Sequence, residues 1–222
     1  CSGKTRTLCH ETLVDTSFRV APGRWRLWRC TQCGAAYLDP RPAETTIHIA
    51  YESYYTHVSQ VPPEPNAAQR VRRWLTNGYA NQRYGSKRTP ATPMGTIAAR
   101  IVPILGRIAD RDFRHLPIPT DGMCSLLDVG CGDGAFLAEA RDCGWQVLGL
   151  EPDKRAAAVA RRRGLEVRIG GLECLQAHTG AFDVITLSHV IEHLPRPVQA
   201  LRDCRRLLKP GGQLWLETPN VD

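Results

Sequence analysis

From residue 125 onward, short apolar runs alternate with longer segments in which apolar residues recur at helical spacing. The apolar runs indicate buried β-strands, because they are brief and bounded by turn residues. They lie at 126–130, 146–151, 166–170, 182–188 and 213–219. Strands that alternate with helices in this way pair in parallel through right-handed crossovers. The pattern therefore predicts a doubly wound α/β domain.

The segments between these strands are expected to be helices that end at glycines or turns. They cover 135–144, 152–164 and 197–212, with a weaker helix at 172–178. The last of them is expected to end at the turn formed by Gly211 and Gly212, directly before the fifth strand.

The first 120 residues have a different pattern. Residues 1–43 are strand-like and rich in turns, whereas residues 44–120 carry helical spacing interrupted by prolines. The spacing is formed by Ile47, Tyr51 and Tyr54, by Val71, Trp74 and Leu75, and by Ile97, Ile101, Ile104, Leu105 and Ile108. We expect a small β module (1–43), a helical linker or cap (44–120), and the α/β domain (121–222).

Charge is distributed unevenly over the 222 residues, whose net charge is +7. Residues 1–124 hold 17 Lys/Arg and 9 Asp/Glu, whereas residues 125–222 hold 12 and 13. A basic half fits a nucleic acid, an anionic membrane surface, an acidic substrate or a solvated face. No run approaches the ~20 apolar residues of a membrane helix, and the N-terminus lacks a signal-peptide pattern, so we expect neither.

The nine cysteines do not resemble a disulfide framework, because most are scattered singly through predicted core elements. This usage is typical of small buried residues in a reducing cytoplasm. The chain opens with Cys1 and stops at Asp222, just after the predicted fifth strand. We expect it to be a fragment of a longer protein, with its fifth strand as an exposed edge that promotes aggregation.

The most informative motif is LLDVGCGDGAF, which places Gly130, Gly132 and Gly134 between the first strand and the first helix. Such glycines let a ligand approach the backbone at the carboxyl edge of the sheet. Glu151 ends the second strand, 21 residues after Gly130, where a carboxylate can accept both hydroxyls of a ribose. The pattern predicts a nucleotide-like ligand; a tight turn beside a solvated acid is the structural alternative.

The acids around this loop indicate which ligand binds. A dinucleotide site has the spacing GxGxxG, whereas this loop is GxGxG and is flanked by Asp128 and Asp133. Two acids repel a pyrophosphate but suit a cationic group, such as the ammonium and sulfonium of S-adenosylmethionine. An NAD(P)-dependent oxidoreductase is the alternative.

These residues resemble the class I S-adenosylmethionine-dependent methyltransferases, and the resemblance continues through FDVITLSHVIEHLPRP, LLKPGG and LWLETPN. It implies a Rossmann-like core with strand order 3-2-1-4-5, followed in such proteins by two further strands. It also implies an S-adenosylmethionine site at Asp128, Gly130, Gly132, Gly134, Glu151, Gly171, Leu172 and Ser188. Glu151 would hold the ribose, and Gly171 and Leu172 would flank the adenine.

The segment SHVIEHLP follows the fourth strand and carries the candidate catalytic groups His189, Glu192 and His193. Their i, i+3 and i+4 spacing puts them on one face of a helical turn. The HxxEH string also matches a zinc-peptidase motif, but Pro195 and Pro197 leave room for barely one turn, so we reject that interpretation.

Three interpretations of this turn remain. The first is that it binds a divalent metal, because it resembles the turn of ubiquinone-biosynthesis O-methyltransferases that supplies acidic and histidine ligands to such a metal. Here His189 occupies the first position of the turn, where those proteins have an acid. The interpretation we favour is that His189 or His193 is a general base. The structural alternative is that Glu192 and His193 only brace the turn.

The N-terminal segment RCTQCGAAYLDPRP, followed by YESYYTH, resembles methyltransferases that carry a zinc ribbon and act in glycan or secondary-metabolite pathways. Cys30 and Cys33 form a CxxC half-site for structural Zn²⁺. The resemblance implies that Cys1 and a cysteine preceding it complete the site in the parent protein. Cys9 and His10 are the substitute ligands that this chain offers, although their spacing from Cys1 is unlike a knuckle, and two unligated cysteines in a hairpin are the structural alternative.

The methyl acceptor is expected to be a small molecule or glycan, with a nucleotide-linked or lipid-linked sugar as the leading candidate by analogy with the ribbon subgroup. A ribbon-based nucleic-acid-binding module is a third hypothesis. Its aromatic residues Trp25, Trp28 and Tyr37 are few enough to be core, so nucleic acid is not the expected partner.

Overall fold

The computed structural model describes residues 3–16, 23–41, 43, 64–119 and 124–219. The chain forms two compact units, Cys1–Val58 and Ser59–Asp222. Within the described residues, no helix has both the length and the apolar character that crossing a membrane requires.

The first unit contains a three-stranded antiparallel sheet in the order β1-β2-β3. Its strands are β1 (Arg6–Leu13), β2 (Trp25–Cys30) and β3 (Ala36–Leu38). Arg6 lies 4.0 Å above the Trp28 ring and forms an ion pair with Asp39, which ties the ends of the sheet together. The short strands predicted for residues 1–43 are therefore present.

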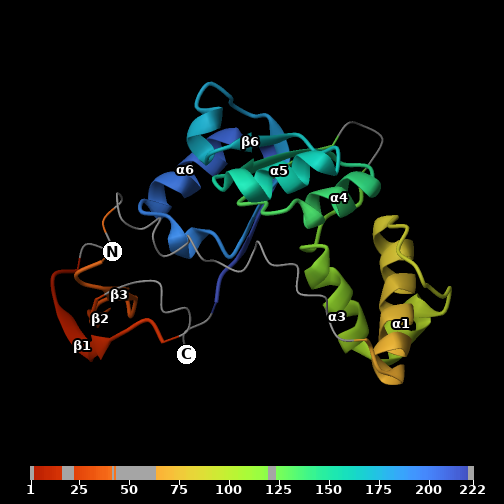
Figure 1. The fold of residues 1–222 in the computed structure, drawn as a ribbon, viewed down its shortest axis with the longest axis horizontal. Coiled ribbons are helices and arrows are strands. Elements are labelled where there is room, and N and C mark those ends of the chain that lie inside the picture. The colour runs from red at the N-terminus through yellow and green to blue at the C-terminus, as the bar shows by residue number, and fades with distance from the viewer. Residues whose placement is uncertain (1–2, 17–22, 42, 44–63, 120–123, 220–222) are drawn as a thin grey trace. The chain divides into compact units, whose positions relative to one another are not determined.

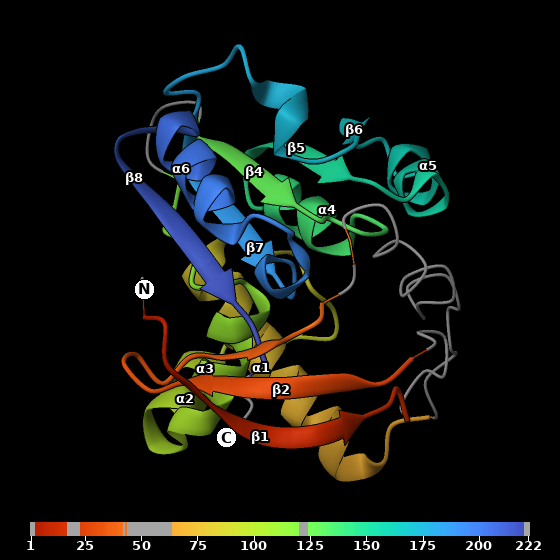
Figure 2. The ribbon, with the colours of Figure 1, turned by 90° about the vertical axis from the view of Figure 1, so that its left-hand side faces the viewer.

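The second unit contains a five-stranded parallel sheet in the order β6-β5-β4-β7-β8, with β4 in the middle (Figure 2). Its strands are β4 (Ser125–Val129), β5 (Gln146–Glu151), β6 (Val167–Ile169), β7 (Phe182–Ser188) and β8 (Leu208–Glu217). Counted from β4, this is the predicted order 3-2-1-4-5. Every pairing is parallel, as the alternation of strands and helices predicted.

Helices cover both faces of this sheet, because successive residues of a strand point to opposite faces. In β4, Leu126 joins a cluster formed with α4 (Ala135–Asp142) and α5 (Lys154–Arg162). The next residue, Leu127, joins the opposite cluster, which includes residues of α6 (Pro197–Leu207) and of a short 3₁₀ helix at Leu172–Leu175. Both leucines are fully buried, so β4 forms the centre of the core.

One predicted boundary is wrong. The helix expected over residues 197–212 ends at Leu207, and β8 begins at Leu208 rather than at residue 213. The Lys-Pro-Gly-Gly sequence reads as a turn, but it continues the strand past an irregularity in the β7–β8 pairing, with Gly211 at φ +77°. Glycine makes that backbone conformation accessible within a strand.

The helical segment consists of α1 (Ala67–Tyr84), α2 (Gly95–Ile101) and α3 (Pro103–Asp112), with α3 beside α1 (Figure 1). A capping box starts α1: Asn66 Oδ1 accepts from the Gln69 N–H, and Gln69 Oε1 accepts from the Asn66 N–H, both at 2.9 Å. The rings of Tyr84 and Phe113 stack 4.6 Å apart in the small core of this segment. The group Ile47, Tyr51 and Tyr54 lies outside the described residues.

The apolar repeat at residues 97–108 is helical, but it does not mark one buried face. The helix breaks between Ile101 and Pro103, and Ile97, Ile101 and Ile104 are 49%, 75% and 55% exposed. The buried positions of α3 are Leu105, Gly106 and Ala109. The spacing therefore predicted helices correctly, although its apolar positions do not share one buried face.

Candidate active site

Polar residues gather at the carboxyl ends of the parallel strands, the edge at which open α/β sheets bind ligands. Asp128 lies near the end of β4, Glu151 ends β5, Ser188 ends β7 and Glu217 ends β8. Ser188 Oγ lies 3.2 Å from Glu217 Oε2. The sheet order thus brings together residues that are up to 89 positions apart in the sequence.

The glycine loop between β4 and α4 is held by Glu151. One carboxylate oxygen of Glu151 accepts from the Gly132 N–H at 2.8 Å, and the other accepts from the Asp153 N–H at 2.9 Å. Gly132 has φ +56°, and a Cβ at this position would have no neighbour within 4 Å. The loop backbone at Gly132 is therefore open to a ligand. Burial raises the pKa of Glu151, and these two backbone hydrogen bonds offset part of that rise.

The other two loop glycines are required by packing inside the protein. A Cβ on Gly130 would lie 2.5 Å from Val190 Cγ2, and a Cβ on Gly134 would lie 2.5 Å from Leu165 Cδ1. Both residues also have positive φ values, of +70° and +77°. All three glycines were predicted as cofactor-binding residues. At Gly130 and Gly134, packing within the protein already requires a residue without a Cβ.

Asp128 is buried in the centre of the sheet and forms an ion pair with Arg114. Thr186 Oγ1 donates to the same oxygen, Asp128 Oδ1, at 2.8 Å, and Arg114 Nη1 lies 3.0 Å from Thr186 Oγ1. Burial raises the pKa of Asp128, while Arg114 and Thr186 lower it. The second oxygen, Oδ2, is buried and has no hydrogen-bond partner among the described residues.

Arg114 was not predicted from the sequence. It follows α3 in a turn with φ +49°, and its guanidinium lies 3.7 Å from the centroid of the Phe136 ring and 5.4 Å from that of Trp215. These cation–π contacts add to the ion pair in fixing the side chain. No local motif marks Arg114, because its partners lie 14, 22, 72 and 101 residues further along the chain.

This arrangement fits a ligand that carries an ammonium and a ribose. The buried unpaired Oδ2 of Asp128 can accept from a cationic donor, and the lone pairs of Glu151 left by its two N–H bonds can accept from hydroxyls. The open backbone at Gly132 lies between them in sequence and contacts Glu151 directly. The residues predicted for the methionine and ribose ends of S-adenosylmethionine are therefore suited to that cosubstrate.

The predicted adenine residues follow β6. The Gly171 N–H donates to Glu173 Oε1 at 2.6 Å, which fixes the turn. The Leu172 side chain is 8% exposed and packs in the cluster on the α6 face of the sheet. An adenine could contact this residue at its backbone and at the edge of its side chain that remains exposed.

The turn after β7 brings the three predicted catalytic groups together. Glu192 Oε1 lies 3.7 Å from His189 Nδ1 and 3.9 Å from His193 Nε2. His189 Nε2 lies 3.9 Å from Glu217 Oε2, a residue that the sequence analysis did not single out. His189 has φ +54°, and its N–H donates to Glu217 O at 2.9 Å. Burial lowers the pKa of His193.

A cavity of about 410 Å³ opens beside this turn. Residues lining it include Arg114, Phe136, Ser188, His189, Trp215 and Glu217. His189, which is 52% exposed, is the predicted catalytic group that belongs to this lining. Ring surfaces from Phe136 and Trp215 and polar groups at the strand ends make the cavity suitable for a small organic molecule.

The CxxC pair lies in the first unit. Cys30 ends β2 and Cys33 lies in the turn that follows, with the Gly34 N–H donating to Cys30 O at 3.0 Å. Hydrogen bonds from the backbone N–H groups of Cys33 and Gln32 lower the pKa of Cys30. Cys1 lies outside the described residues. Among the residues that are described, no group of three or more His, Cys, Asp or Glu side chains is placed to hold a metal ion.

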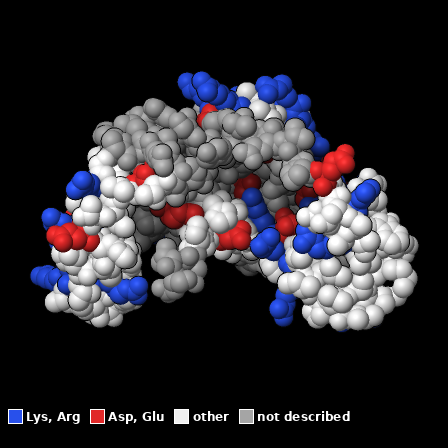
Figure 3. Space-filling model, turned by 60° about the horizontal axis from the view of Figure 1, so that its bottom comes forward, with Lys and Arg blue, Asp and Glu red and all other residues white. Residues whose placement is uncertain are grey.

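The basic residues do not form one continuous surface on the face drawn in Figure 3. Lys and Arg side chains lie there in separate groups, with Asp and Glu side chains near several of them. On this face the charged side chains have the distribution of solvated and locally paired residues.

The fold and the carboxyl-edge site define a Rossmann-like domain of the methyltransferase type. The sequence pattern of the family described as "Methyltransferase domain" matches residues 87–222, more than half of the chain. The chain belongs to this family. The match includes the glycine loop, Arg114, Asp128 and the whole parallel sheet.

Ubiquinone biosynthesis O-methyltransferases are among the curated relatives. The chain is 41% identical over 102 residues to that of Xanthomonas oryzae pv. oryzae (strain PXO99A), covering 43% of each chain. It is 38% identical over 103 residues to that of Sodalis glossinidius (strain morsitans), covering 43% of this chain and 41% of the relative. The chain thus matches less than half the length of these relatives.

Solved structures of methyltransferases also match part of the chain. An S-adenosylmethionine-dependent methyltransferase from Archaeoglobus fulgidus aligns with a TM-score of 0.44 and 25% identity, covering 55% of this chain and 53% of the other. One from Mesorhizobium loti aligns with a TM-score of 0.43 and 26% identity, covering 48% and 50%.

The Arg114–Asp128 pair predicts a large and specific effect on stability. Arg114→Met keeps much of the packing but leaves the Asp128 carboxylate buried without its cation, so we expect the free energy of unfolding to fall by about 3 kcal/mol. Asp128→Asn in the same chain should restore at least ~1 kcal/mol relative to the sum of the single variants. Urea unfolding of the four proteins measures the coupling.

Arg111→Met is the matched control, because Arg111 is exposed and lies three residues earlier in the same segment. We expect it to change the free energy of unfolding by no more than ~0.5 kcal/mol. Additive losses at Arg114 and Asp128, or an equal loss at Arg111, would contradict a buried ion pair.

Proposed function

We propose that this protein transfers a methyl group from S-adenosylmethionine to a hydroxyl of a small-molecule acceptor. The observation that carries the proposal is the buried, unpaired Oδ2 of Asp128 beside a glycine loop whose Gly132 N–H is held by Glu151. This pair of carboxylates fits a ligand with an ammonium at one end and a ribose in the middle. Membership of the methyltransferase domain family supports the same ligand.

The chain's residues divide the binding of that cosubstrate among them. Asp128 Oδ2 would accept from the methionine ammonium, and Arg114, which is held by Asp128, Phe136 and Trp215, would face the methionine carboxylate. Glu151 would accept from the ribose hydroxyls, and the turn at Gly171 would adjoin the adenine. S-adenosylmethionine supplies an electrophilic methyl carbon when it is bound.

The cavity beside β7 would hold the acceptor. Phe136 and Trp215 would exclude water and orient the acceptor, which is the main requirement of methyl transfer. As the acceptor oxygen bonds to the methyl carbon, the carbon–sulfur bond breaks with its electron pair leaving on sulfur, and the hydroxyl proton needs a base. His189 or His193 would take that proton, and Glu192, within 4 Å of both imidazoles, would stabilise the cation that forms.

The acceptor class is inferred from the relatives and the cavity. The relatives are named for O-methylation in ubiquinone biosynthesis, which supports a hydroxyl of a small molecule of that kind as one candidate. A glycan or a nucleotide-linked sugar is the other candidate. We also propose a cytoplasmic location, because Cys131 and Cys204 are single buried free thiols, a usage typical of a reducing compartment.

The cosubstrate can be tested by calorimetry. We expect S-adenosylhomocysteine to bind this chain and NADH not to bind, because the unpaired Oδ2 of Asp128 favours an ammonium and the Glu151 carboxylate favours ribose hydroxyls, whereas neither oxygen can accept from a pyrophosphate. Glu151→Gln should weaken S-adenosylhomocysteine binding by about 10-fold, through loss of charge-assisted hydrogen bonds to the ribose. Binding of NADH without S-adenosylhomocysteine would overturn the proposed function.

The base can be tested by kinetics. We expect His189→Ala or His193→Ala to lower turnover by about 10²-fold while S-adenosylhomocysteine affinity holds. An imidazole accepts a proton only when neutral, and burial lowers the pKa of His193, so a base at His193 would stay active below pH ~6.5 and lose activity only at more acidic pH. Near-normal turnover in both variants, with or without a chelator, would leave only a bracing role for this turn.

We also propose that Cys30 and Cys33 supply two thiolates to a structural Zn²⁺, with Cys1 as a further ligand. Backbone hydrogen bonds favour the thiolate of Cys30, the form that binds metal. Metal analysis of the purified protein should give about one zinc per chain, and Cys33→Ser should remove it, whereas Cys9→Ser should not. A zinc-free protein would refute this assignment.

A further inference from the structure

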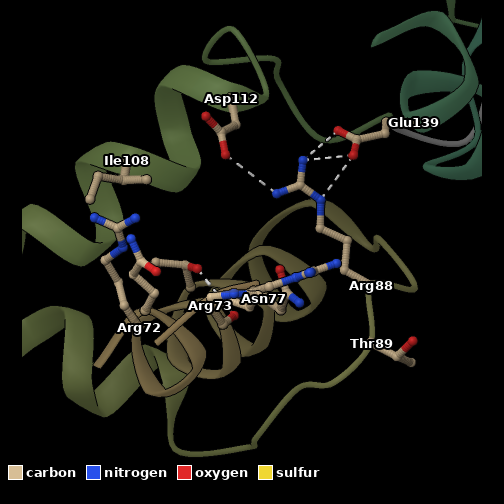
Figure 4. A pocket seen from close by; sticks show the side chains of 11 residues that line it. Arg72, Arg73, Asn77, Arg88, Thr89, Ile108, Asp112 and Glu139 are labelled. Atoms are coloured by element: carbon tan, nitrogen blue, oxygen red, sulfur yellow. Dashed lines mark hydrogen bonds and ion pairs between the residues drawn. The ribbon is translucent and has the colours of Figure 1, made fainter. Parts of the chain in front are cut away.

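A second cavity lies between the helical segment and the core, within the unit Ser59–Asp222 (Figure 4). Its volume is about 810 Å³, within the range of sites for cofactors and nucleotides. Arg72, Arg73 and Asn77 reach it from α1, Ile108 and Asp112 from α3, and Glu139 from α4. All of α1 precedes residues 87–222, so the methyltransferase family match does not account for this wall.

The acidic residues of this cavity are already paired. Arg88 Nη2 lies 2.7 Å from Glu139 Oε1 and 2.5 Å from Glu139 Oε2, and Arg88 Nη1 lies 3.5 Å from Asp112 Oδ2. The Arg88 guanidinium also lies 4.5 Å from the centroid of the Phe113 ring, which fixes its place. Arg88 therefore neutralises much of the negative charge in the lining, as the dashed lines in Figure 4 show.

Three of the four neutral polar residues of the lining, Gln69, Thr76 and Asn77, are also hydrogen-bonded within the protein. Thr76 Oγ1 donates to Arg73 O at 3.2 Å, and Asn77 Nδ2 donates to Pro90 O at 2.8 Å. By contrast, the guanidinium groups of Arg72 and Arg73 have no hydrogen bond or ion pair to any described residue. Two exposed, adjacent guanidiniums thus face a large cavity whose acids are already occupied by a third arginine.

The surrounding sequence strengthens the positive potential. Residues 65–109 contain eight Lys and Arg and no Asp or Glu. The lining itself holds three arginines and two acids, so it carries a net positive charge, which concentrates anionic ligands. Two guanidiniums present planar donor groups that match phosphate oxygens. The chemistry of this cavity is therefore that of a phosphate or diphosphate site.

The cavity adjoins the candidate active site. Asp112 lines both this cavity and the one that contains His189 and Trp215. A molecule with its reacting hydroxyl beside β7 could therefore extend an anionic group along α3 toward α1. Both parts belong to the same compact unit, and the ion pair between Arg88 and Glu139 connects the segment that follows α1 with α4.

We propose that Arg72 and Arg73 bind a diphosphate group carried by the methyl acceptor. This inference rests on the proposed function for the identity of the acceptor, whereas the diphosphate site itself is argued from the cavity. A diphosphate with charges on both phosphoryl groups suits two adjacent guanidiniums. It is shared by nucleotide-linked and lipid-linked acceptors.

Binding of inorganic pyrophosphate by calorimetry tests the site. We expect Arg72→Ala/Arg73→Ala to weaken binding by about 10-fold or more, because two charge-assisted contacts are lost. Arg70→Ala/Arg83→Ala is the matched control: it removes the same charge from the same helix, but neither residue lines the cavity. We expect that control to weaken binding by no more than about 2-fold.

Pyrophosphate that fails to bind the wild-type chain, or that is weakened equally by both double variants, overturns the inference. S-adenosylhomocysteine binding is measured on the same proteins, so loss of the diphosphate site is distinguished from failure of the proposed function. Uridine diphosphate and geranyl diphosphate then separate the sources: tighter binding of the first indicates a nucleotide-linked acceptor, and of the second a lipid-linked one. A preference for either diphosphate supports the proposal if the double variant Arg72→Ala/Arg73→Ala no longer shows that preference.

Discussion

The buried contact between Arg114 and Asp128 is the interaction on which most of this structure depends. A carboxylate in the middle of a parallel sheet is costly unless a cation and further donors reach it. Arg114 and Thr186 satisfy one oxygen of Asp128, and the cation comes from the turn that follows α3. The position of the helical segment against the sheet is therefore coupled to the charge of Asp128, the residue of β4 that lies just before the glycine loop.

Much of the parallel sheet could be predicted because it is specified by local patterns. Leu126 and Leu127 are apolar neighbours in a brief run, and a strand buried on both faces requires such a run. The glycines of the loop and Glu151 could also be predicted, because their spacing reflects one strand–turn–helix–strand unit. The turn at His189, Glu192 and His193 brings its members together for the same reason, since all three lie within five residues.

Other features depend on contacts that no local pattern records. Arg114, Trp215 and Glu217 meet at the site only after the sheet has assembled, so nothing near each residue marks it as functional. The beginning of β8 was missed because Pro210 and Gly211 read as a turn, whereas the strand already pairs with β7 at Leu208 and resumes its pairing at Gln213, past an irregularity. At Ile101 the local pattern predicted the helix correctly but not the burial of the side chain. Ile101 is the last residue of α2, directly before the break at Pro103, and its side chain is exposed.

The two backbone hydrogen bonds that Glu151 accepts have a consequence for ligand affinity. They hold the carboxylate in one orientation before any ligand arrives, so little side-chain entropy remains to be lost on association. The same bonds couple the loop at Gly132 to the end of β5, and a ligand that contacts either one meets a preorganised surface. Affinity at this edge then comes from rigidity in the empty protein as much as from the number of contacts a ligand makes.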